Sequence, residues 1–191
     1  MAPLPHWDNS TAGRNSYEPI FQNQFEFIIT PPAAIAGDPN VPLLIEQILT
    51  VSGIPEQMTA ASVTQYYKFS KRAYAAATPN ETLAKLSCTF EVNLDNENNM
   101  YVYNTLRAWA DLIYDPLTGR QGLKRDYVGS AKLVIFNKAG DIFREFTFVN
   151  MFLDKELTAM SLDYSSTNIY KLTAGFTSDT WRETRIGQIP V

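Results

Sequence analysis

The sequence predicts a mainly β fold, an antiparallel β-barrel or sandwich of about six strands with one flanking α-helix. Two runs rich in β-branched and aromatic residues, 127–136 and 142–152, are separated by a short glycine-containing segment, which is the pattern of a β-hairpin. An earlier run, 21–30, alternates between apolar and polar residues as a half-buried strand does. A helical apolar stripe lies between these runs, in 97–114.

The first strand is expected over 21–30. Its apolar residues Phe21, Phe25, Phe27 and Ile29 fall on one face, and the two prolines that follow mark its end. The next apolar run, 43–49, is too short for its periodicity to distinguish a helix from a strand, so both assignments stay open.

The region 54–94 has few aliphatic residues before Leu83 and is crowded with aromatic and small side chains. One turn is expected at 78–81, where Pro79 presets the required backbone angle, and a second candidate turn lies near 70–72. Arms of about ten residues at ~3.3 Å each would reach ~33 Å, beyond the ~16 Å radius of gyration of a compact domain of this length. On the residues alone, a projecting hairpin and an ordinary surface loop are equally supported.

The segment 83–94 alternates as a strand does, and Cys88 is in phase with Leu86, Phe90 and Val92. We therefore expect a buried thiol in the core. The chain has one cysteine and one histidine, His6, so we expect no intrachain disulfide, no Cys–His catalytic pair and no zinc site.

The helix is expected from about Glu97 to Tyr114. The run 95–99 supplies candidate N-cap residues and acidic side chains for the first turn. Apolar residues recur at spacings of four, three and four, at Val102, Leu106, Trp109 and Ile113. We expect this single stripe to cover the sheet. The segment 115–119, which contains Pro and Gly, ends the helix, and a charged loop follows at 120–126.

The strand over 142–152 has apolar residues on both faces. One face is expected to carry Ile142, Phe146, Phe148 and Phe152, and the other Phe143, Val149 and Met151. A sheet with one solvated face alternates more cleanly than this. Either both faces are covered within the fold, or one face meets another chain.

Composition limits the classes of function. A chain of 191 residues with 45% hydrophobic residues suits one globular domain. Sixteen Lys and Arg against twenty Asp and Glu give a net charge of −4, which weakly repels nucleic acid. No apolar run approaches the roughly 20 residues that a membrane span needs, and the N-terminus lacks the regions of a signal peptide. We therefore expect a protein of an aqueous compartment.

Two pairs of carboxylates have a spacing that suggests acid/base chemistry: Asp111 with Asp115, and Asp154 with Glu156. Solvated charges at helix ends and in loops are far more common than catalytic pairs. We therefore expect no catalytic role for either pair.

The loop that contains Gly119, Arg120, Gly122 and Lys124 superficially suggests phosphate binding. Its spacing matches neither a P-loop nor a dinucleotide-binding fingerprint, and no strand leads directly into it. A basic loop that faces a partner is the better interpretation.

Basic and aromatic residues interleave in 66–74. Three cations stand among four aromatic side chains, Lys68, Lys71 and Arg72 with Tyr66, Tyr67, Phe69 and Tyr74. Single-stranded nucleic-acid binders have such interleaving, but the acidic total opposes that function. Aromatic and Arg side chains are equally typical of protein interfaces.

Several segments follow one another in a specific order: Ile54-Pro55, Cys88-Thr89-Phe90-Glu91-Val92-Asn93, a helix with Leu106-Arg107-Ala108-Trp109, the hairpin over 127–152, and Leu162-Asp163-Tyr164-Ser165-Ser166 leading to Trp181. In this order and spacing the chain resembles the tail tube proteins of contractile-tailed bacteriophages, a family distantly related to type VI secretion tube proteins. The resemblance covers roughly 25–181, about four-fifths of the chain.

This resemblance favours a long β-hairpin that projects from the barrel in the region 54–94. It implies subunits that form hexameric rings, with the rings stacked through this hairpin into a tube for genome delivery into the host. The stacking residues would be Tyr66, Tyr67, Phe69, Arg72 and Tyr74. Residues 1–20 would form an extended arm, 21–185 the barrel domain and 186–191 a C-terminal tail.

The resemblance also implies partners and a setting. The subunit would contact other copies of itself, the tail sheath protein, and the baseplate initiator, tape-measure and tail terminator proteins. DNA would pass through the lumen without specific binding, and the protein would not insert stably into a membrane. It would belong to the virion, in the phage tail, after assembly in the host cytoplasm. We expect no enzymatic activity, no cofactor and no metal ion.

Two alternatives remain. The tube subunit of a related contractile injection device, either a type VI secretion system or an extracellular particle, would share the fold. A monomeric β-barrel ligand-binding protein would need one inner face that lines a pocket, and it would stay monomeric at all concentrations. A hydrolase is the weakest alternative because the chain has no recognisable nucleophile motif.

Overall fold

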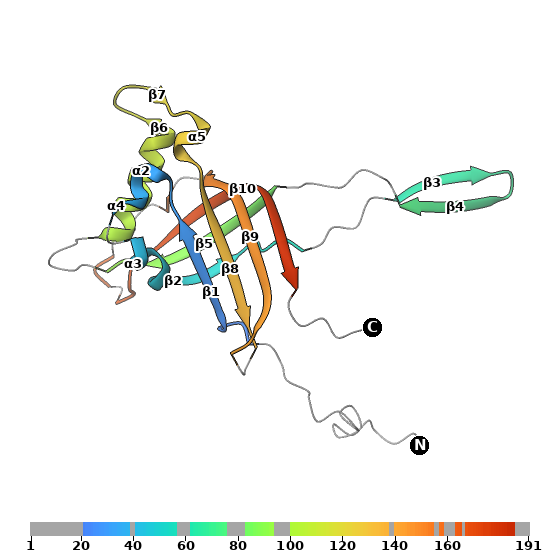
Figure 1. Ribbon diagram of the computed structural model, residues 1–191, viewed down its shortest axis with the longest axis horizontal. Helices are drawn as coiled ribbons and strands as arrows, with labels where there is room; N and C mark the ends of the chain where they lie inside the picture. The colour runs from blue at the N-terminus through green and yellow to red at the C-terminus, as the bar shows by residue number, and fades with distance from the viewer. Residues whose placement is uncertain are drawn as a thin grey trace, which may run out of the picture.

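The computed structural model describes residues 21–38, 41–56, 62–75, 83–93, 100–137, 140–154, 157–158, 163–165 and 167–185. Several expectations lie outside these residues: the arm 1–20, the tail 186–191, the turn at 78–81 and the helix-capping run 95–99. In the described part, a curled sheet forms the body, short helices gather at one end of it, and a two-stranded hairpin stands away from it (Figure 1).

The body is one six-stranded antiparallel sheet, which confirms the predicted mainly β barrel or sandwich. In spatial order its strands are β1 (Phe25–Thr30), β8 (Gly129–Phe136), β9 (Ile142–Leu153), β10 (Lys171–Arg185), β5 (Ala84–Glu91) and β2 (Ile48–Ser52). The sheet curls into a nearly closed barrel, so that the edge strands β1 and β2 line the two sides of one opening.

The predicted hairpin over 127–152 is confirmed as β8 paired with β9, with Leu133 opposite Phe146. One expectation within it is wrong. Phe146 and Phe148 are buried, but the next buried residues are Met151 and Leu153, and Phe152 lies on the other face. Asn150 is the cause: it is skipped in the register and has a φ of 54°, so a bulge shifts the alternation by one residue.

The first strand is shorter than predicted. β1 begins at Phe25 because residues 21–24 form a turn, in which the backbone N–H of Gln24 donates to the carbonyl of Phe21 at 3.3 Å. Phe27 and Ile29 are buried as expected, whereas Phe21 is exposed. The ambiguous run 43–49 contains both kinds of structure, since α3 (Val41–Glu46) is followed after one turn residue by β2.

The flanking helix is α4 (Tyr101–Ile113), and its predicted stripe is confirmed: Val102, Leu106 and Trp109 are buried. Tyr114 ends the helix because its backbone is extended and pairs with Gln121, joining β6 (Tyr114–Asp115) to β7 (Arg120–Gln121). Three short helices complete the structure described: α2 (Ala33–Ala36), α3 and α5 (Lys124–Tyr127).

Trp109 fixes α4 on the sheet. Its indole N–H donates to the backbone carbonyl of Tyr127 at 2.7 Å, and its ring lies 5.6 Å from that of Phe176 on β10, measured between centroids. Gly129 makes room for it: a Cβ there would lie 3.1 Å from the indole ring and 2.4 Å from the carbonyl oxygen of Thr30. The apolar core between helix and sheet depends on this close approach.

Candidate assembly surfaces

The region 62–75 forms a hairpin of its own, β3 (Ser62–Tyr67) paired with β4 (Ser70–Ala75). All of its residues are exposed, and it stands away from the barrel (Figure 1). Lys68 and Phe69 form the turn, with Lys68 at a φ of 29°. The candidate turn near 70–72 thus lies slightly earlier than expected, because residues 70–72 belong to β4. Each strand has six residues instead of about ten.

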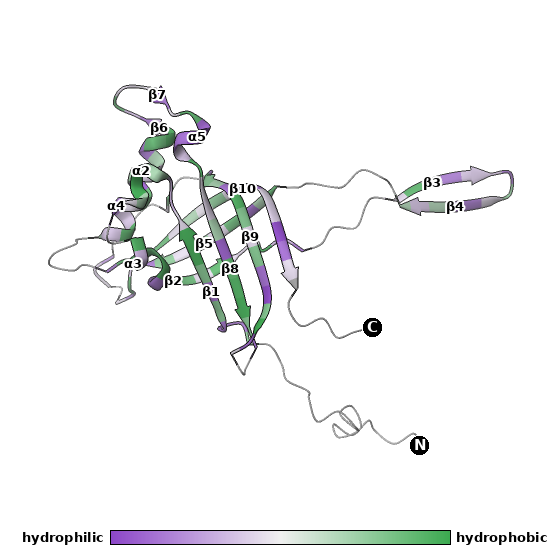
Figure 2. Ribbon diagram, viewed as in Figure 1, coloured by the Kyte–Doolittle hydropathy of each residue, from purple (hydrophilic) through white to green (hydrophobic). Residues whose placement is uncertain are grey.

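The structure brings the five predicted stacking residues together on this hairpin but divides them between its faces. The register pairs Val63 with Tyr74, Gln65 with Arg72 and Tyr67 with Ser70 on one face, while Tyr66 pairs with Lys71 on the other. Phe69 lies at the tip and is fully exposed, at 102%. Figure 2 shows hydrophilic and hydrophobic residues mixed along both strands.

The hairpin surface combines apolar area with positive charge. Tyr66 and Tyr67 are 74% and 64% exposed. The Lys71 ammonium lies 5.1 Å from the centroid of the Tyr66 ring, a cation–π arrangement. Residues 62–75 include three cations and no Asp or Glu. Exposed aromatic residues together with Arg are typical of a protein interface.

Arg144 on β9 ties the barrel to the chain that leads into the hairpin. Its guanidinium donates two hydrogen bonds to the Glu56 carboxylate, at 2.8 and 3.0 Å, and its Nε donates to Glu183 on β10 at 2.7 Å. These bonds, the one to Glu56 foremost, raise the pKa of the Arg144 guanidinium above its ordinary value. A network of charges on the barrel wall therefore holds Glu56, the last described residue before the hairpin.

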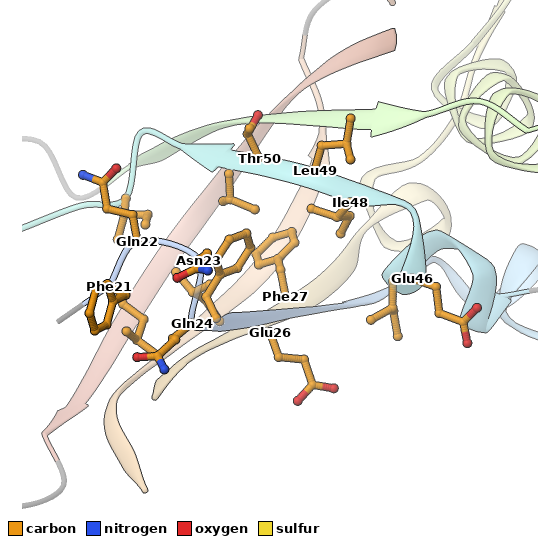
Figure 3. A pocket seen from close by; sticks show the side chains of 16 residues that line it. Phe21, Gln22, Asn23, Gln24, Glu26, Phe27, Glu46, Ile48, Leu49 and Thr50 are labelled. Carbon is orange, nitrogen blue, oxygen red and sulfur yellow. The ribbon is translucent and has the colours of Figure 1, made fainter. Parts of the chain in front are cut away.

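The second candidate surface is a groove of about 920 Å³ between the edge strands β1 and β2 (Figure 3). Apolar side chains from both walls and from β8 line it, including Phe25, Phe27, Ile48 and Leu133. Each wall is the last strand of the sheet, so the backbone on its outer side has no neighbouring strand of that sheet. A further segment of polypeptide could therefore bind in the groove.

Glu26 and Glu46 are the charged residues among those that line the groove, and both are exposed. Figure 3 places them on opposite walls, with Glu26 on β1 and Glu46 at the end of α3. Gln24, at the entrance of β1, has a buried side-chain oxygen with no hydrogen-bond partner in the described part of the chain. The groove is apolar inside and acidic at its margins.

The Leu-Asp-Tyr-Ser-Ser segment is described at 163–165. The Asp163 carboxylate accepts hydrogen bonds from the backbone N–H and the hydroxyl of Ser165, and these bonds lower the pKa of Asp163. This local turn leaves Tyr164 fully exposed. The segment therefore presents an aromatic side chain on the surface.

One carboxylate of each pair from the sequence has a local hydrogen-bond partner. Asp115 accepts hydrogen bonds from the Thr118 hydroxyl and the Leu117 N–H, which lower its pKa and stabilise the turn after α4. Asp154 accepts a hydrogen bond from the hydroxyl of Thr177. Glu156 lies outside the described residues, so the Asp154–Glu156 pair is untested.

The basic loop is also held by local contacts. Lys124 forms an ion pair with Asp179 on β10, and its ammonium lies 5.8 Å from the ring centroid of Phe152. Gly119 adopts a φ of 67° in the turn between β6 and β7. The described residues contain no group of three or more His, Cys, Asp or Glu side chains placed to hold a metal ion. In the same part of the chain, no helix is long and apolar enough to cross a membrane.

The fold is shared with solved components of contractile particles. A chain from the anti-feeding prophage cap, described as its tube terminating cap, matches with a TM-score of 0.58 and 14% identity over 90% of this chain and 94% of that chain. A chain from the extended sheath–tube complex of the extracellular contractile injection system PVC matches with a TM-score of 0.53 and 14% identity. The match covers 95% of this chain and 100% of that chain. A chain from the six-fold symmetrised anti-feeding prophage baseplate matches with a TM-score of 0.51 and 11% identity. The match covers 89% of this chain and 98% of that chain.

At these identities the likeness shows a common fold. No protein-family model matches the sequence, and no curated protein matches it either.

The hairpin residues were predicted from the sequence as a candidate surface, but the groove was not. Its walls come from 21–27 and 45–54, and alternation assigns each of them to a separate strand without showing that the two lie opposite one another.

Proposed function

We propose that this chain is a structural, non-enzymatic subunit of the tube of a contractile injection machine. Subunits form hexameric rings, and the rings stack through the β3–β4 hairpin around a channel. The observation that carries the proposal is the combination of this outlying hairpin, exposed along its whole length, with a nearly closed barrel of the fold found in contractile particles. Monomeric proteins rarely expose so much aromatic surface.

The phage tail is the setting that the sequence resemblance implies. There the tube is enclosed by sheath, begins on a baseplate initiator, ends at a terminator, and carries DNA without binding it specifically. The acidic net charge of −4 suits such a conduit. An extracellular injection particle is the alternative, and it is favoured by the source of several matching structures. Both settings require the same stacking subunit.

A terminator that forms one ring is a second candidate, because two of the matching structures are described as a tube terminating cap and as a sheath/tube terminator. A terminator and a tube subunit differ in one observable respect. Tube subunits add rings without limit as the concentration rises, whereas a terminator stops after one ring.

Negative-stain electron microscopy over a concentration series tests the proposal. Hollow tubes of variable length support a tube subunit, single rings support a terminator, and monomers at all concentrations, even with baseplate seeds, support the ligand-binding alternative. Deletion of residues 64–76 should leave a folded subunit that builds no tubes. Long regular tubes from this deletion would overturn the role of the hairpin.

A pair of point variants refines the test. Phe69→Ser removes a fully exposed aromatic ring at the hairpin tip, and Leu117→Ser removes a comparably exposed side chain, at 95%, in the turn between β6 and β7. Neither side chain is part of the core, so both variants should fold normally. Phe69→Ser should raise the critical concentration for tube growth more than Leu117→Ser does.

A further inference from the structure

The β1–β2 groove has no occupant within the described chain. Its lining comes from residues 21–27, 45–46, 48–51, Ile54 and two residues of β8, and it includes nothing from the hairpin. The hairpin extends away from the barrel (Figure 1), with all its residues exposed. Within the described residues, each subunit therefore presents both an apolar groove and an exposed aromatic projection.

The two surfaces are complementary in charge. The groove has two carboxylates at its margins, Glu26 and Glu46, and no Lys or Arg in its lining. The hairpin has the opposite composition, with Lys68, Lys71 and Arg72 and no acidic residue in 62–75. Opposite charges around an apolar centre are the usual arrangement of a specific protein interface.

The surfaces also match in chemistry. Leu49 and Phe21 are exposed apolar residues of the groove, and Tyr67 and Phe69 are exposed apolar residues near the hairpin tip. The groove volume of about 920 Å³ is in the range of sites that enclose several side chains. An aromatic anchor inserted into an apolar pocket, with cations at its rim, is the common form of a binding hot spot.

We propose that the tip of the β3–β4 hairpin of a second copy of this chain docks in the β1–β2 groove. Tyr67 and Phe69 cover the apolar interior, and Lys71 and Arg72 approach Glu26 and Glu46. The inference rests on the proposed function and names the partner surface of the stacking hairpin. A projection that binds a different surface on the next copy is a heterologous contact, which repeats along an axis and does not close into a dimer. A stacked tube needs a contact of this kind.

A charge exchange tests the contact. Glu26→Lys with Glu46→Lys places four cations against each other, and Lys71→Glu with Arg72→Glu places four carboxylates against each other. Each double variant should raise the critical concentration for tube growth at least about ten-fold. The quadruple variant restores opposite charges and keeps the net charge of −4, so it should recover tubes. All substituted residues are exposed, so circular dichroism should show unchanged folding.

The outcomes separate this inference from the proposed function. If the wild-type protein forms neither rings nor tubes, with or without baseplate seeds, the proposed function itself fails. If the wild-type protein forms tubes but the groove variant Glu26→Lys with Glu46→Lys forms them equally well, the groove proposal alone is overturned. If both double variants fail to form tubes and the quadruple variant does not recover them, the two surfaces do not meet, and the proposal is again overturned.

Cross-linking supplies a second measurement. Leu49→Cys in the groove and Phe69→Cys at the hairpin tip, combined in one chain, should give a ladder of covalent oligomers with a short bis-maleimide. Cys88 is fully buried and should not react. Each single variant, and Phe69→Cys combined with Leu117→Cys, should give no long ladder. If residues 1–20 fill the groove instead, Leu49→Cys stays protected in free subunits and the ladder does not form, which overturns the proposal.

Discussion

The guanidinium of Arg144 donates two hydrogen bonds to the carboxylate of Glu56, and this pair joins the barrel wall to the last described residue before the hairpin. The same guanidinium lies 4.8 Å from the ring centroid of Phe146 and also binds Glu183 on β10. One side chain therefore links the β9–β10 pair to Glu56.

The Arg144–Glu183 and Arg144–Glu56 ion pairs should differ in their contribution to the free energy of unfolding. Arg144→Met leaves the Glu183 side chain, which is 9% exposed, without its Arg144 partner, and should lower the free energy of unfolding by about 3 kcal/mol. Glu56→Gln changes a carboxylate that is 68% exposed and should cost less than about 1 kcal/mol. Urea denaturation at neutral pH measures both. Equal losses would show that the stabilising energy lies in the Arg144–Glu56 bonds and not in the Arg144–Glu183 bond of the β9–β10 pair.

The elements with a strong local pattern could be predicted from the sequence. The β8–β9 hairpin has two long β-branched and aromatic runs, and α4 has a regular stripe ending in Trp109, so both were identified. The run 43–49 could not be assigned because its first part is helical and its last part belongs to β2. Pattern alone does not locate a change of structure within seven residues.

Of the two candidate surfaces, the hairpin could be predicted in part from the sequence and the groove could not. The aromatic and basic residues of the hairpin were recognised by composition, but the division between faces depends on the turn at Lys68 and Phe69, whose sequence is not typical of a tight turn. The β1–β2 groove depends on how far the sheet curls. That curvature is set by packing among distant strands and has no local signal.

The bulge at Asn150 should be sensitive to the residue type. With a φ of 54°, Asn150 occupies the left-handed region, which asparagine and glycine tolerate and β-branched residues do not. Asn150→Val should lower the free energy of unfolding by about 1–3 kcal/mol, whereas Asn150→Gly should stay within about 1 kcal/mol of wild type. Guanidinium denaturation provides the measurement. Equal stability of the Val and wild-type proteins would mean that the bulge does not constrain this strand.

Gly129 should be intolerant of any side chain. Its Cβ would lie 2.4 Å from a backbone carbonyl oxygen and 3.1 Å from the Trp109 ring, so Gly129→Ala has to separate α4 from the sheet. We expect a loss of about 1–3 kcal/mol, with reduced near-ultraviolet dichroism from the displaced indole. Gly37→Ala is the matched control, because a Cβ at Gly37 meets nothing within 4 Å. The control should unfold at nearly the wild-type denaturant concentration, and a similar loss in both variants would contradict the steric explanation.

Cys88 should make stability depend on pH in the alkaline range. Burial raises the pKa of its thiol from 9.0 to about 12, because a thiolate inside the core loses its solvation. Between these values the unfolded chain releases the thiol proton while the folded chain keeps it, so the folded state loses stability as the pH rises. Relative to Cys88→Ala, the wild-type protein should lose up to about 1.4 kcal/mol per pH unit above pH 9. The variant titrates the same lysines and tyrosines, so they cancel in the comparison of urea midpoints from pH 7 to 10.5. A difference that stays constant over this range would mean that the thiol ionises in the folded protein as readily as in the unfolded chain.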